Sequence, residues 1–204
     1  MDKKILALKH YFLKDINFVI RLLIVSDVIL VGAAGLFSPV FAIFIEDFII
    51  GGNAAVVGVS VAVYLFTKST LQIPLAAFID KIKGEKDDFM FLFWGSVVMS
   101  VIPLLYLVIN LPWQLYIIQF VLGFFTAMTF PSYVAIFTRH IDNHKEGTEW
   151  GVYFTLTDLS SATLAAIGGF IAISIGFNFL IISMVFFSVL GTIFLLPIKK
   201  YLRK

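Results

Sequence analysis

Three ionisable side chains, Asp27, Lys68 and Asp158, lie inside long apolar stretches of a 204-residue chain. A charge surrounded by hydrocarbon is costly, so such groups normally face a protein interior or an aqueous cavity, where they bind substrates or carry protons. Asp27 is the strongest candidate for this chemistry. A structural ion pair between Asp27 and Lys68 is the alternative, because burial and one nearby cation leave both protonation states open. Asp158 lies among small residues, which favours a role in helix contact or at a water-exposed position.

Other polar side chains accompany these charges at helical spacing. The polar run from Thr67 to Thr70 is flanked one turn away by Tyr64 and Gln72, and a helix wholly exposed to lipid would not tolerate it. In a later apolar run, four polar residues fall within about 80° of arc at 100° per residue: Gln119, Thr126, Thr129 and Tyr133. We therefore predict a cavity whose candidate substrate-binding or proton-coupling residues are Asp27, Lys68, Gln72, Gln119, Thr126 and Tyr133.

Residues for other kinds of chemistry are missing from the sequence. The chain contains no Cys, which excludes disulfides, thiol catalysis and Cys-based metal sites. His10, His140 and His144 do not form a recognisable metal-ligand pattern, and we expect them in solvated segments. No Gly-rich phosphate loop or nucleophile elbow is present. We expect neither an enzyme nor a resident cofactor or metal.

Six apolar runs must position the candidate residues. They cover residues 19–45, 54–79, 89–110, 113–137, 151–174 and 177–198, and each can span a bilayer at about 1.5 Å per residue. Inside a bilayer the backbone must satisfy its own hydrogen bonds, so these runs predict an all-α integral membrane protein with six transmembrane helices over residues 19–198. Pro39, Pro74 and Pro131 permit bending within three of the spans.

Basic residues are distributed very unevenly around these runs. Of the 15 Lys and Arg residues, all except Lys68 lie in segments that would share one side of a membrane. Positive residues resist translocation, so we expect a multi-pass protein of the cytoplasmic membrane with both termini in the cytoplasm. The basic surface suits anionic lipids, and we expect no nucleic-acid partner.

The two ends of the chain carry part of this basic character. Residues 1–18 show helical spacing of apolar residues, which indicates an amphipathic segment on the inner leaflet, with a frayed polar leader as the alternative. They lack the pattern of a removable signal peptide. Residues 199–204 form a basic cytoplasmic tail.

Two weaker patterns concern the arrangement of the helices. The motif Ser38-Pro-Val-Phe-Ala-Ile-Phe44 is echoed by Pro131-Ser-Tyr-Val-Ala-Ile-Phe137, and such an echo suggests two three-helix repeats inserted in opposite orientations. In the fifth run one helical face is almost entirely small, which suits close helix contact: Gly151, Thr155, Asp158, Ala162, Ala165, Gly169 and Ala172.

Three segments together resemble the major facilitator superfamily of transporters. The loop from Asp80 through Lys81 and Gly84 to Lys86 is similar to the family's inner-loop signature, although Ala76 replaces a glycine and one extra residue precedes Gly84. The run Gln119-Phe-Val-Leu-Gly123, with Ala127 and Pro131, is similar to the fourth-helix pattern, in which Gln119 replaces the usual arginine. The small residues ending at Gly168 and Gly169 resemble the fifth helix, without its Gly-Pro pair.

The resemblance implies a fold and a function for the chain. The family ordinarily has twelve spans in two similarly inserted six-helix halves, so it implies a half-size form that pairs as a twofold homodimer around a shared cavity. It also implies secondary transport of a small solute by alternating access, and proton coupling through Asp27 is one mechanism that this allows. By the same resemblance, Asp80 would reach the positive end of the partner's fifth span near Gly151.

The resemblance also defines candidate gating residues, and one different function stays open. The gating and inner-loop candidates are Asp80, Lys81, Gly84, Lys86, Gly151 and Asp158. The alternative to a homodimeric transporter is a non-transporting membrane scaffold, or a fragment or subunit that needs a different partner chain.

Overall fold

The computed structural model describes residues 13–14, 16–82 and 84–202, and this part of the chain is all helical. Six helical segments are long and apolar enough to cross a membrane, which confirms the predicted fold class. The elements are α2 (Phe18–Phe37), η1 (Ser38–Val40), α3 (Phe41–Phe48), α4 (Ala54–Ile79), α5 (Lys86–Val101), η2 (Ile102–Leu107), α6 (Pro112–His140), α7 (Glu146–Ser174), α8 (Phe177–Ile193) and η3 (Leu196–Lys200).

Prolines interrupt some spans and leave others continuous. The first span breaks at Pro39, which lies in the first turn of η1 before α3 begins, because proline lacks the N–H that an α-helix interior needs. Pro103 opens η2 in the same way. Pro74 and Pro131 lie inside α4 and α6 without interrupting them. In a membrane helix, neighbouring groups can satisfy the freed carbonyls.

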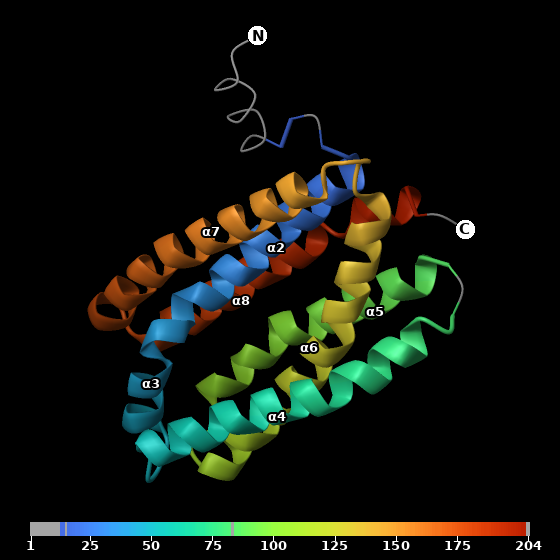
Figure 1. Ribbon diagram of the computed structural model, residues 1–204. Coiled ribbons are helices and arrows are strands. Elements are labelled where there is room, and N and C mark those ends of the chain that lie inside the picture. Colours follow the sequence, from blue (N-terminus) through green and yellow to red (C-terminus); the bar gives the residue numbers. More distant parts are fainter. Residues whose placement is uncertain (1–12, 15, 83, 203–204) are drawn as a thin grey trace.

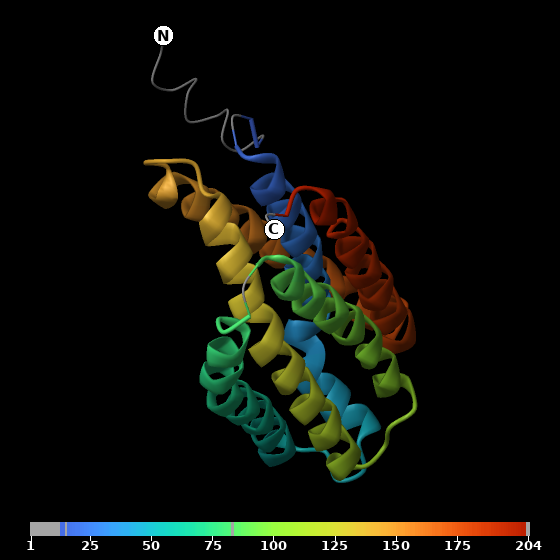
Figure 2. The same cartoon turned by 90° about the vertical axis from the view of Figure 1, so that its right-hand side faces the viewer.

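The packing of the six spans follows two inverted three-helix repeats. In Figure 1, α2, α7 and α8 lie together, as do α4, α5 and α6. The first span packs mainly on the fifth and sixth (α2 on α7 and α8), and the fourth mainly on the second and third (α6 on α4 and α5). Exchanging the first three spans with the last three therefore reproduces the same contacts. Figure 2 shows α4 and α8 on opposite flanks of the bundle.

Small residues allow the closest approaches between helices. These approaches are also related by exchanging the first three spans with the last three. A Cβ added to Gly191 of α8 would meet α2 at Leu30 and the Ser26 carbonyl, and one added to Gly95 of α5 would meet Thr129 of α6. A hydrogen bond reinforces the first approach, since the Ser26 hydroxyl donates to the Gly191 carbonyl at 2.8 Å. Close backbones of this kind replace the hydrophobic driving force that is absent between helices in lipid.

We expect Gly168→Ala to lower stability, because its Cβ would overlap the backbone of Leu36 in α2. Overpacking costs about 1–3 kcal/mol, and backbone cannot rotate away as a side chain can. The neighbouring Gly169→Ala is the control, because a Cβ there meets nothing within 4 Å. Both variants gain helix propensity, so a lower melting temperature in detergent for Gly168→Ala alone is the expected result. Equal melting temperatures would contradict this account of α2 and α7.

Two apolar cores lie toward the two ends of the bundle. One contains Phe37, Phe44 and Tyr106 from the first and third spans. The other contains Ile24, Phe137 and residues around them, and it lies at the end that carries the described basic loops. We call that end the basic end. Residues 1–12 of the predicted amphipathic segment lie outside the described residues, while Leu13 and Ile16 pack against the second core.

The end of the sixth span is helical beyond the predicted boundary. Lys199 and Lys200, predicted to begin a basic tail, lie in the last turn of η3. The ring of Tyr201 then packs on Phe18 at 4.9 Å between centroids. This contact joins the start of the first span to the segment after the last.

Candidate functional site

A cavity of about 650 Å³ lies among α2, α4, α5, α6, α7 and α8, bordered by residues of both apolar cores. Its walls are mainly aromatic and aliphatic, with hydroxyl and amide groups among them. Asp27 is its one carboxylate, and the described residues that line it include no Lys, Arg or His. The aromatic part consists of Phe37, Phe41, Tyr64, Tyr106, Phe130, Tyr133 and Tyr153. Mostly apolar walls with a few polar groups are typical of small-molecule sites.

Asp27 is held by a tyrosine from another span. The Tyr153 hydroxyl of α7 donates a hydrogen bond of 2.6 Å to an Asp27 carboxylate oxygen. The contact joins the first and fifth spans at the cavity wall. None of the described ion pairs joins Asp27 to Lys68, so the alternative that these two residues pair is wrong in this protomer. The second carboxylate oxygen of Asp27 has no hydrogen bond among the contacts described, and it could accept one from a solute.

Lys68 lies beside an aromatic ring and not beside Asp27. Its ammonium lies 5.5 Å from the centre of the Phe130 ring of α6, within the range of a cation–π contact. Gln72 lies one turn further along α4. Together with Asp80 and Arg139, it lines a second hollow of about 520 Å³ between α4 and α6. Lys68 and Gln72 are therefore placed outside the lining of the main cavity.

The polar stripe of α6 does line the main cavity. Gln119 donates to the Tyr106 hydroxyl at 3.1 Å, so Gln119 is tied to η2. The Thr126 hydroxyl bonds its own helix at the Leu122 carbonyl, and it accepts from Tyr64 at 3.4 Å. The Tyr133 hydroxyl is buried without a hydrogen-bond partner, which leaves it ready to meet a solute group.

The candidate gating residues divide between a loop and one face of α7. Asp80 caps the end of α4, and Lys86 is the first residue of α5. Gly84 has φ of +121° in the turn between them, a conformation that residues with a Cβ rarely adopt. Lys81, Lys86, Gly151 and Asp158 are exposed.

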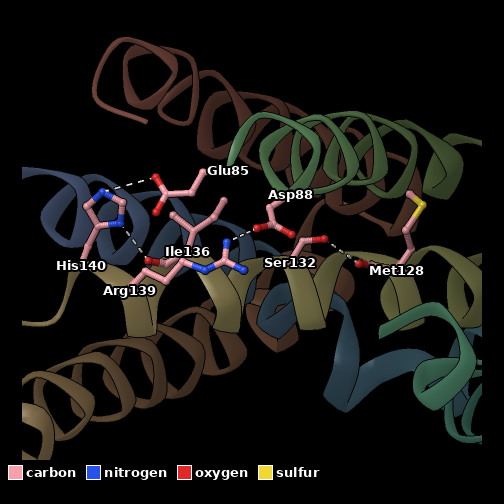
Figure 3. A network of polar contacts seen from close by, with 7 residues as sticks. All are labelled: Glu85, Asp88, Met128, Ser132, Ile136, Arg139 and His140. Atoms are coloured by element: carbon pink, nitrogen blue, oxygen red, sulfur yellow. Dashed lines mark hydrogen bonds and ion pairs between the residues drawn. The ribbon is translucent and has the colours of Figure 1, made fainter. Parts of the chain in front are cut away.

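A polar network at the basic end ties α5 to α6 (Figure 3). Arg139 of α6 donates to the buried Asp88 of α5 in an ion pair. The next residue, His140, has its Nδ1 3.0 Å from the Ile136 carbonyl and its Nε2 3.7 Å from a Glu85 carboxylate oxygen. His140 was expected in a solvated segment, and this was wrong, since it is only 5% exposed.

The site contains residues that sequence reasoning did not select. Tyr153 and Tyr106 are the main ones in the cavity, and both are ordinary aromatic residues of apolar spans. Asp88, in the polar network at the basic end, was also not selected. His144 is exposed as expected, and His10 lies outside the described residues. Among the described residues no group of three or more His, Cys, Asp and Glu could hold a metal ion. The arrangement therefore offers one acid, several hydroxyls and aromatic faces, which together can hold a cation or a proton.

Comparison with protein families gave a match over most of the chain. The model of the Major Facilitator Superfamily matches residues 23–204. That range contains all six spans except the first turn of α2. No curated protein matches the chain.

Proposed function

The chain belongs to the major facilitator superfamily, and we propose that it is a homodimeric secondary transporter of amphipathic cations that works by alternating access. The family consists of membrane transporters, so membership argues for transport and against an enzyme. The proposal adds a substrate class, an assembly and a coupling mechanism to that general function.

The observation that carries the proposal is the composition of the cavity. Its one carboxylate, Asp27, lies among seven aromatic rings and without a basic residue in the described lining. A carboxylate attracts a cation strongly where little water screens it. Aromatic faces add cation–π attraction and apolar contact. The same carboxylate can exchange its solute for a proton, which would couple transport to a proton gradient.

The exposure of two spans supports the homodimer. Only 11% of the apolar stretch of α4 and of α7 is buried within the protomer, compared with 33% to 44% for the other four spans. A second copy related by a twofold axis would cover both helices and close the cavity from the other side. In this assembly Asp80 would lie near the start of the partner's α7, which begins at Glu146, five residues before Gly151. Lys81, Gly84 and Lys86 belong to the segment that follows Asp80.

The proposed orientation follows from the basic end. With that end in the cytoplasm, both termini of the protomer face inward, and the lysines and arginines meet anionic lipid headgroups. The cytoplasmic membrane is the proposed location.

Transport of a cationic probe in proteoliposomes tests the function. We expect an imposed pH gradient to move ethidium at least fivefold faster than in protein-free liposomes. The anion carboxyfluorescein is the control and should move at the background rate. Absence of gradient-driven ethidium movement would contradict cation transport, and movement of carboxyfluorescein would contradict the assigned selectivity.

A further inference from the structure

We propose that Lys68 of one protomer forms an ion pair with Asp158 of a second copy, within a membrane-embedded contact between α4 and α7. The inference rests on the proposed homodimer and adds the contact that specifies it. In a twofold dimer this contact is made twice, because each protomer supplies one α4 and one α7.

The two charges lie equally far along their helices from the basic end of the bundle. Lys68 lies twelve residues before Asp80, which caps α4, and Asp158 lies twelve residues after Glu146, where α7 begins. Both of those helix ends belong to the basic end of the bundle. At 1.5 Å per residue, each charge is about 18 Å from that end. Two helices packed side by side would therefore bring them level.

Neither charge has an opposite charge within its own protomer among the ion pairs described. Asp158 is exposed on α7, and Lys68 is half-buried against the Phe130 ring. An unpaired carboxylate facing acyl chains at this depth is costly. In a second copy, a residue of opposite charge lies at the same distance from the basic end, so a second copy can neutralise both charges.

The shapes of the two surfaces also match. Asp158 lies on the small-residue face of α7, and a Cβ added at Gly151 or Gly169 of that face meets nothing within 4 Å. The face is thus open at these two glycines and at Asp158, which is exposed. Beside Lys68 lies the hollow between α4 and α6, which Gln72 and Ala76 line on the side toward the basic end. A slender helix face can enter such a groove, as small residues permit in membranes.

The positions of the two helices allow both contacts at once. In Figure 1, α7 and α4 form the two outer edges of the bundle, with α2 and α6 between them. A second copy turned by a half rotation about the membrane normal would place its α7 against α4 and its α4 against α7. The cavities of the two copies would then face each other.

Cysteine cross-linking in membranes tests the contact, and the chain suits it because it contains no natural Cys. Differently tagged Lys68→Cys and Asp158→Cys chains are co-expressed and treated with a short bifunctional thiol reagent. We expect a mixed dimer at least tenfold more abundant than in the control of Phe66→Cys with Leu159→Cys. Phe66 lies two residues before Lys68 and Leu159 directly after Asp158, and both control residues are exposed, at 73% and 56%.

A second cysteine pair keeps both charges in place. Gln72 and Thr155 lie about one turn nearer the basic end on their helices, so Gln72→Cys with Thr155→Cys should cross-link as strongly. This pair decides the test if removing a charge impairs folding. Equal cross-linking of the control and both test pairs would overturn the proposed contact.

The mass of the wild-type protein in detergent distinguishes failure of this ion pair from failure of the proposed function. If the wild-type protein is a dimer that moves ethidium but neither test pair cross-links, the ion pair is wrong and the transporter stands. If the wild-type protein is monomeric, the homodimer itself is wrong.

Lys68→Asp and Asp158→Lys should each reduce the dimer fraction at least fivefold, and the double exchange should restore it. Failure of the double exchange to restore the dimer would also overturn the pairing.

Discussion

Asp27→Asn is expected to reduce ethidium transport driven by a pH gradient to the background of protein-free liposomes. Asn keeps the size of Asp and can still accept a hydrogen bond from the hydroxyl of Tyr153, but it carries no charge and does not gain or lose a proton as a carboxylate does. Loss of one member of a buried charge pair costs about 2–5 kcal/mol, which corresponds to at least a thirtyfold weaker affinity for the cation. The measurement is the initial rate of ethidium movement at matched protein density.

The control for this substitution is Asp47→Asn. Asp47 is an exposed residue of α3 at the end of the bundle opposite the basic end, outside the cavity lining. It therefore makes the same chemical change without touching the site, and its rate should equal that of the wild type. Unchanged pH-driven transport by Asp27→Asn would show that another group couples the proton.

The class of fold could be predicted because the bilayer restricts the choices. Six apolar runs of sufficient length can cross a bilayer only as helices, and the structure has all six helices. The echo around Pro39 and Pro131 indicated inverted repeats, which the helix packing reproduces. Helical periodicity likewise placed Gln119, Thr126 and Tyr133 on one face, and all three line the cavity.

The pairings within the site could not be predicted in the same way. Tyr153 is 126 residues from Asp27, and only the packing of α7 on α2 brings them together. Nothing in a local pattern distinguishes this tyrosine from its neighbours. For the same reason the sequence left the pairing of Asp27 with Lys68 open.

Errors at helix ends explain the remaining differences. Apolar runs indicated spans from residue 89 and up to residue 137, whereas α5 begins at Lys86 and α6 ends at His140. Polar residues of a first or last helical turn interrupt an apolar run without ending the helix. Asp88, Arg139 and His140 all lie in such turns, so the network that they form was missed.

Arg139→Ala is expected to destabilise the protein by about 3 kcal/mol, the lower part of the range for breaking a buried ion pair. The reason is the asymmetry of the pair, since the side chain of Asp88 is 1% exposed and that of Arg139 is 39% exposed. Removing the arginine leaves a buried carboxylate without its cation. Thermal and chemical unfolding in detergent measure the loss, and Arg21→Ala is the control because Arg21 is exposed at the same end of the bundle.

The double variant Asp88→Asn with Arg139→Ala distinguishes an orphaned charge from lost side-chain packing. If the cost of Arg139→Ala comes from the unpaired carboxylate of Asp88, neutralising that carboxylate should recover at least half of the lost stability. If the cost comes from the contacts of the arginine stem, the double variant should be no more stable than the single one. Recovery is the expected result, because Arg139 is the cation that bonds the buried Asp88 and a neutral amide tolerates burial far better than a carboxylate.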